Sequence, residues 1–131
     1  MRLLLDTRVW LWMVAEPGRL TDDAKALLTA STTDLFLSSA SVWEIGAKLA
    51  SGRVKFPGRP EVHIPLYIKR SGVQPLPITA GHALRALELP PHHGDTYDRM
   101  LIGQALVEEL TLATADPGLA VYEVPLLQVA P

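Results

Sequence analysis

The sequence predicts an α/β domain with a parallel sheet. Short, fully apolar runs alternate along the chain with segments that have helical spacing. Apolar runs of this length are typical of parallel strands that are buried on both faces. Strands that alternate with helices favour βαβ units over an all-β or all-α arrangement. The length of 131 residues fits a single domain, residues 1–131, with a substantial core.

Five segments are predicted strands. Four of them are almost uninterrupted apolar runs, whereas the third is weaker because Pro75 and Pro77 lie within it. The predicted strands are Arg2–Asp6, Asp34–Ser39, Gly72–Ile78, Thr111–Ala115 and Val124–Val129.

Six segments are predicted helices, over residues 7–16, 21–31, 39–52, 60–72, 79–90 and 95–110. The second begins at a Thr-Asp-Asp cap, and the third ends at Gly52. Pro65 weakens the fourth prediction. Periodicity predicts one apolar face in the third helix and one in the fifth, and an apolar surface on most sides of the sixth. These two faces consist of Val42, Ile45 and Leu49, and of Ala83, Leu84 and Leu87.

The composition predicts a cytoplasmic globular protein. Hydrophobic residues make up 48% of the chain and charged residues 20%, and there is no cysteine to suggest secretion. The apolar start carries Asp6 and Arg8 within the run, which argues against a signal peptide or a membrane span. The formal net charge of −2 excludes nucleic-acid binding through a general positive field. Any nucleic-acid contact must therefore be local.

Acidic residues fall where the predicted strands end and the predicted helices begin. In a right-handed βαβ unit these ends share one edge of the sheet, which is where ligands bind in open α/β folds. Asp6 and Asp116 end two strands, whereas Asp95, Asp98 and Glu44 lie in the first turns of two helices. We expect all five acids at the same edge.

Each acid has a second interpretation as a helix cap. Ser41 and Glu44 have the spacing of a capping box, and Asp6, Asp95 and Asp116 occupy cap positions. As a set, however, converging carboxylates repel one another unless a cation neutralises them. Magnesium prefers a few carboxylates completed by water and substrate phosphate. Thr7 and Thr114, beside the acids, are candidates for orienting them.

Several motifs resemble the PIN-domain ribonucleases, specifically the VapC-type toxins of bacterial toxin–antitoxin pairs. The motifs are an acid after the first strand in "LLLDTRVWLW", the pattern SxxSxWEI in "SSASVWEIGAKLASGRV", and then "YDRMLIGQA" and "TADP", in that order over nearly the whole chain. The resemblance implies a three-layer α/β/α domain with a five-stranded parallel sheet. It also implies that Asp6, Glu44, Asp98 and Asp116 are catalytic and bind one or two Mg²⁺ or Mn²⁺ ions to cleave RNA.

The resemblance further implies partners and supporting residues. It implies a small antitoxin that occludes the acidic groove, and a homodimer. Asp95 matches a capping or supporting Asp, and Thr114 matches a supporting hydroxyl. Arg8 stands where the family often has His, and Thr96–Tyr97 where it often has Pro-Phe. We expect Arg8 to contact RNA phosphate, with Arg99 and the basic loop around Arg53, Lys55 and Arg59 as further candidates.

Other interpretations remain open. A haloacid-dehalogenase-like phosphatase needs a second Asp two residues after Asp6, where this chain has Arg8, and a receiver domain needs an acidic pair that is not apparent. A catalytically degenerate PIN domain that only binds antitoxin or RNA is the main alternative.

The tryptophans Trp10, Trp12 and Trp43 are expected to pack rather than to stack on bases. His92–His93 is expected to cap a loop, and His63 and His82 to face solvent or pack locally.

Overall fold

Five parallel strands form one sheet in the order β3-β2-β1-β4-β5. The computed structural model describes residues 1–54, 56–92 and 94–130. Each predicted strand is present, with bounds shorter by one to four residues. The strands are β1 (Arg2–Leu5), β2 (Asp34–Ser38), β3 (Gln74–Leu76), β4 (Thr111–Thr114) and β5 (Leu126–Gln128).

All six predicted helices are also present. They are α1 (Thr7–Ala15), α2 (Asp22–Thr29), α3 (Ser39–Ala50), α4 (Pro60–Ser71), α5 (Ala80–Leu87) and α6 (Thr96–Glu108). Two short 3₁₀ turns, η1 (Pro17–Arg19) and η2 (Pro117–Val121), were not predicted. Both begin at a proline, whose fixed φ suits the first position of a helical turn. No helix in the described ranges is long and apolar enough to cross a membrane.

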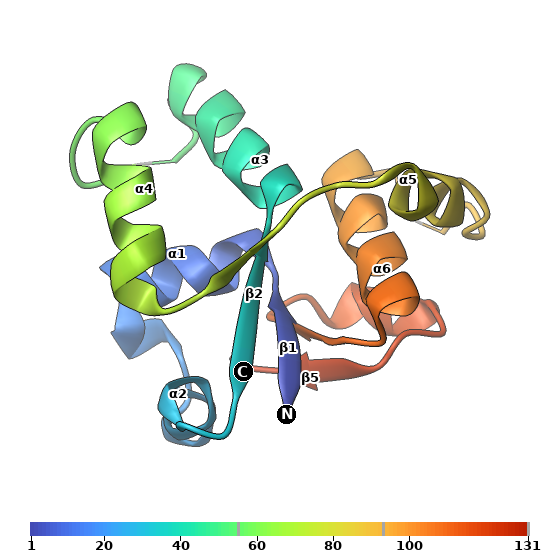
Figure 1. Ribbon diagram of the computed structural model, residues 1–131, viewed down its shortest axis with the longest axis horizontal. Coiled ribbons are helices and arrows are strands. Elements are labelled where there is room, and N and C mark those ends of the chain that lie inside the picture. Colours follow the sequence, from blue (N-terminus) through green and yellow to red (C-terminus); the bar gives the residue numbers. More distant parts are fainter. Residues whose placement is uncertain (55, 93, 131) are drawn as a thin grey trace.

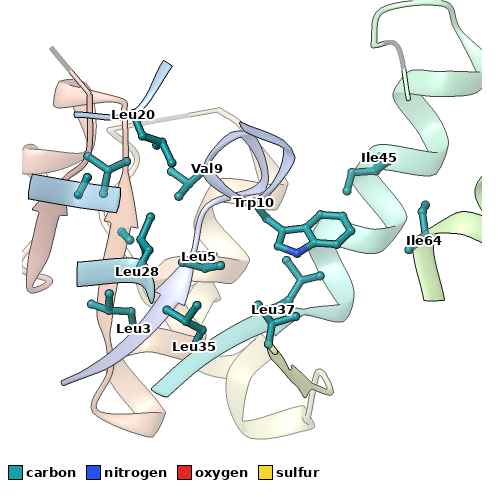
Figure 2. Packing of buried hydrophobic residues seen from close by; sticks show 14 residues of the cluster. Leu3, Leu5, Val9, Trp10, Leu20, Leu28, Leu35, Leu37, Ile45 and Ile64 are labelled. Carbon is teal, nitrogen blue, oxygen red and sulfur yellow. The ribbon is translucent and has the colours of Figure 1, made fainter. Parts of the chain in front are cut away.

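The helices cover both faces of the sheet, which confirms the predicted α/β/α layering (Figure 1). Alternate residues of a strand point to opposite faces. Leu3 and Leu5 accordingly pack in one buried cluster with side chains of α1, α2 and α4, whereas Leu4 packs in another with side chains of α6. Figure 2 shows the first cluster, where Trp10 lies close to Leu37 and Ile45. Because β1 is buried on both faces, packing fixes the position of its carboxyl end.

The third strand is short because of its prolines. Pro75 lies inside β3, and Pro77 follows its end. A proline has no backbone N–H to donate to a neighbouring strand, so it is tolerated on an edge strand only. β3 is an edge strand and pairs with β2 alone.

α6 is anchored by a close approach to α5. A Cβ atom on Gly103 would lie 2.9 Å from the carbonyl oxygen of His82 and 3.1 Å from the Cβ of Ala86. Only glycine allows this spacing between the two helices without a shift. The contact fixes α6, and with it the first-turn residue Asp98.

Two sequence-based predictions about packing are wrong. Leu84 and Leu87 are 61% and 77% exposed, and α5 instead buries His82 and Ala86. Trp43 is 73% exposed rather than packed, whereas Trp10 is fully buried as predicted. His82 packs locally, which is one of its two predicted outcomes: it is buried, and its Nδ1 accepts a hydrogen bond from the backbone N–H of Thr79 (3.0 Å) within a capping box.

Candidate active site

A cavity of about 300 Å³ opens at the carboxyl edge of the sheet, where β1 and β4 end and α3 and α6 begin. The structure brings all five predicted acids into its lining. The lining residues are Asp6, Thr7, Arg8, Glu44, Lys48, Asp95, Asp98 and Asp116. A larger cavity of about 540 Å³, between α1, α2 and α4, has no carboxylate among the described residues that line it. The acidic cavity is therefore the candidate site.

Asp6 is held by the neighbouring strand rather than by its own helix. It occupies the N-cap position of α1 but makes no side-chain capping hydrogen bond. Instead the hydroxyl of Thr114 on β4 donates to its Oδ2 (2.8 Å). Burial raises the pKa of the Asp6 carboxyl, against the lowering effect of this hydrogen bond. The interpretation of Asp6 as only a cap is wrong, because its carboxylate points to another element.

Glu44 lies on the buried face of α3. The helix begins at Ser39, so Glu44 is in the second turn and not in the first. Its Oε1 accepts from the Thr7 hydroxyl (2.6 Å), which also hydrogen-bonds Ser41 (2.9 Å). The predicted Ser41–Glu44 capping box is absent, since the cap of α3 is Ser38, whose hydroxyl accepts from the backbone N–H of Ala40.

Asp98 has the strongest electrostatic perturbation in the cavity. Burial and the negative charges of Asp6, Asp95, Glu44 and Asp116 raise its pKa to about 7. Asp95 is the N-cap of α6, and its Oδ1 accepts from the backbone N–H groups of Tyr97 and Asp98. The capping interpretation of Asp95 is confirmed, and its cap hydrogen bonds fix the turn that carries Asp98.

Asp116 also caps a helical turn while it lines the cavity. Its Oδ1 accepts from the backbone N–H of Gly118 (2.8 Å) at the start of η2. Thr114 accepts from the backbone N–H of Asp116 (3.0 Å), so one hydroxyl fixes both Asp6 and Asp116. Thr114 thus contacts two of the predicted site residues, and its supporting role stays a prediction.

The donor set suits a hard divalent cation. Carboxylate oxygens are the ligands that Mg²⁺ and Mn²⁺ prefer. Burial first, and then the negative charge of four neighbouring carboxylates, raise the pKa of Asp98. Among the described residues, however, no three acidic or histidine side chains converge closely enough to hold a metal ion. Asp6, Glu44, Asp95 and Asp116 each accept a hydrogen bond from the protein itself. To bind one cation together, these carboxylates would have to approach one another more closely.

The residues predicted to contact RNA phosphate lie at different places relative to the cavity. Arg8 lines the cavity and lies over the ring of Trp12, 5.9 Å from its centroid. Arg99 does not line it: its guanidinium donates to the carbonyls of Ala86, Leu89 and Pro90 at the end of α5. Arg53 is exposed in the loop after α3. Two further predictions, Lys55 in the basic loop and His93 as a loop cap, lie outside the described residues.

Lys48 is the functional candidate that the sequence analysis missed. Its Nζ lies 2.5 Å from Oε2 of Glu44, four residues earlier on α3, and its side chain lines the cavity. The signal was present in the sequence, because side chains four residues apart share one face of a helix.

Comparison with known structures supports the fold. The crystal structure of VapBC2 from Rickettsia felis bound to a DNA fragment from their promoter matches with a TM-score of 0.74 and 14% identity, over 98% of this chain and 99% of that one. A DNA-bound VapBC from Salmonella typhimurium matches at 0.71 and 16%, over 98% of both chains. FitAcB from Neisseria gonorrhoeae matches at 0.62 and 19%, over 96% of both.

Sequence comparison assigns the family. No curated protein matches this chain. The family model of the PIN domain matches residues 3–124, which include every acid of the cavity and both supporting threonines. The chain therefore belongs to the PIN domain family.

Proposed function

We propose that the protein is a metal-dependent endoribonuclease and the toxin of a type II toxin–antitoxin pair. The observation that carries this proposal is the cavity at the carboxyl edge of a PIN-domain sheet, lined by carboxylates from separate elements of the fold. The resemblance of its motifs to VapC-type toxins supports the choice of RNA as substrate. The similarity to VapBC structures supports the toxin assignment.

Asp6, Glu44, Asp98 and Asp116 are the residues that would hold one or two Mg²⁺ or Mn²⁺ ions. A bound cation of this kind activates water and stabilises the leaving oxygen in phosphodiester hydrolysis. Thr7 and Thr114 orient Glu44 and Asp6 through the hydrogen bonds described above. Asp98 must lose its proton before it serves as a ligand, so the cation and the proton compete for it.

We expect arginine side chains near the cavity to bind phosphate groups of the RNA. Arg8 lines the cavity and is exposed, and Arg53 is exposed beyond the end of α3. Each offers a guanidinium that suits a phosphate group. Arg99 is a weaker candidate because carbonyls at the end of α5 already accept from its guanidinium.

Cleavage of a mixed pool of structured RNA tests the proposal. Purified protein is incubated with Mg²⁺, with EDTA, and as the Asp98→Asn variant. Asp23→Asn is the matched control, because Asp23 is an exposed acid in the first turn of α2. Cutting that needs Mg²⁺ and Asp98 but not Asp23 supports a nuclease. RNA binding that is independent of metal, with no cutting, would instead favour the degenerate, binding-only alternative.

The toxin assignment has its own test in cells. We expect expression of the wild type and of Asp23→Asn to arrest bacterial growth, and Asp98→Asn to permit it. A small antitoxin whose C-terminal segment occludes the acidic cavity is the proposed partner. Its co-expression should restore growth, and the purified complex should not cut RNA. Growth arrest by Asp98→Asn would argue that toxicity does not depend on the acidic cavity.

A homodimer is the second proposed assembly. Trp43 lines an apolar hollow of about 320 Å³ together with Ile78, Tyr97 and Met100. A tryptophan side chain that is this exposed in a single chain is typical of a surface that a binding partner covers. We propose that a second copy of the chain covers it. Trp43→Glu should then shift sedimentation from dimer to monomer, whereas Val121→Glu, at another exposed apolar side chain, should not.

A further inference from the structure

A lysine side chain of the protein, Lys48, lines the acidic cavity. The Lys48 ammonium pairs with Oε2 of Glu44 at 2.5 Å, and the Thr7 hydroxyl donates to Oε1 at 2.6 Å. Both oxygens of Glu44 are thus engaged by the chain. The Glu44 side chain is 5% exposed, whereas the Lys48 side chain is 34% exposed. Lys48 is the partner that can leave, because its side chain is the more exposed of the two.

We propose that Lys48 is the built-in counter-ion of the site: it holds Glu44 until a divalent cation displaces it, and the released ammonium then binds a phosphate of the RNA. This inference rests on the proposed nuclease function. A divalent cation and an ammonium compete for the same carboxylate, since each is attracted to its negative charge. The displaced Lys48 remains in the cavity lining, which also includes Arg8, and offers three donors to an anion.

The flexible stem of lysine suits this exchange better than arginine would. An ammonium on four methylene groups can turn from one acceptor to another within the same cavity, whereas a guanidinium binds a carboxylate through a fixed fork. Glu44 does not depend on Lys48 alone for its placement. The Thr7 hydroxyl, which also hydrogen-bonds Ser41, still donates to its carboxylate after the ion pair breaks.

The exchange predicts opposite effects on metal and on RNA. Lys48→Met retains the length of the stem and removes the charge. It should bind Mn²⁺ about fivefold more tightly than the wild type in calorimetric titration, equivalent to about 1 kcal/mol, which is the upper range for an ion pair that is partly open to solvent. The KM for RNA at saturating Mg²⁺ should rise about threefold or more, because one phosphate contact is lost.

Two further variants make the test specific. Lys25→Met removes the same charge from an exposed ion pair with Asp22 on α2 and should leave both quantities unchanged. Lys48→Arg retains the charge and should bind Mn²⁺ no more tightly than the wild type, because its guanidinium still competes for Glu44. Equal Mn²⁺ affinity in Lys48→Met and Lys25→Met would overturn the counter-ion role, and an unchanged KM would overturn the phosphate contact.

The Mn²⁺ titration does not depend on cleavage. Tighter binding by Lys48→Met in a protein that cuts no RNA would support the counter-ion role while the nuclease proposal fails. Normal cleavage with no effect of Lys48→Met would leave the nuclease proposal standing and refute this inference.

Discussion

Asp98→Asn should stabilise the metal-free protein at alkaline pH and not at acidic pH. In the folded chain the pKa of Asp98 is raised from 3.8 to about 7, chiefly by burial and then by four neighbouring carboxylates. Between about pH 4 and pH 7 the folded state therefore holds a proton that the unfolded state has released. Stability falls over this window as pH rises, because the unfolded state gains more from ionisation. Below pH 4 the penalty is absent, and above 7 it is complete.

The magnitude follows from the size of the shift. About three pKa units at 1.36 kcal/mol each set an upper limit of about 4 kcal/mol. Asp98 is only partly buried, and solvent screening reduces the expected effect to about 1–2 kcal/mol. Relative to the wild type, Asp98→Asn should gain this amount in free energy of unfolding between pH 4.5 and pH 8 in EDTA. The gain would raise the Tm by roughly 3–8 °C.

Urea unfolding at pH 4.5, 6 and 8 measures this difference, with Asp23→Asn as the control for a surface acid. Addition of Mg²⁺ at pH 8 should stabilise the wild type, since a cation that binds the folded state alone raises its stability, and should stabilise Asp98→Asn less. The reasoning is refuted if the difference between the wild type and Asp98→Asn does not change with pH, or matches that of Asp23→Asn.

Further predictions concern the supports of the cavity. Thr114→Val should weaken Mn²⁺ binding severalfold in calorimetry, because Asp6 loses the hydroxyl that fixes it, and Thr29→Val, whose hydroxyl bonds only backbone of its own helix, is the control. Gly103→Ala should lower the free energy of unfolding by about 1–3 kcal/mol through overpacking against α5, whereas Gly46→Ala, with nothing within 4 Å of the added methyl group, should be neutral or stabilising. Equal unfolding midpoints for these two alanine variants would contradict the close approach. Mn²⁺ affinity should also rise with pH through about 7 as Asp98 loses its proton, and a flat profile between pH 6 and 8 would contradict that competition.

The strands and the acidic edge could be predicted from sequence because both depend on local signals. Apolar runs such as Arg2–Leu5 identify buried strands, and chain direction in βαβ units places Asp6 and Asp116 at one edge. The predicted apolar face of α3 is confirmed, since Val42, Ile45 and Leu49 pack in the first buried cluster. The exposure of Trp43 on α3 and the buried face of α5 could not be predicted in this way. Hydrophobic periodicity assumes that the buried face is the apolar one.

In α3 the face toward the cavity carries the buried polar residues Ser41 and Glu44, which leaves Trp43 on the exposed side. In α5 the close contact with Gly103 admits Ala86 and the hydrogen-bonded His82, and larger side chains such as Leu87 are turned outward. Both failures have the same cause: a neighbour distant in sequence decides which side chains fit. Buried polar residues on an otherwise apolar helix were the signal of the site.

The capping and functional interpretations of the acids are not alternatives in this fold. Parallel strands end where helices begin, so a carboxylate that caps a helix already lies at the edge where a cation would bind. Asp95 and Asp116 accept capping hydrogen bonds and line the cavity at once. Asp6 and Glu44 differ, because each accepts from a hydroxyl that another element supplies, Thr114 and Thr7 respectively. A carboxylate that only caps a helix needs no hydroxyl from another element. A carboxylate that must keep one orientation against the repulsion of its neighbours needs such a hydroxyl. These two hydrogen bonds are therefore stronger support for a built site than the number of acids around it.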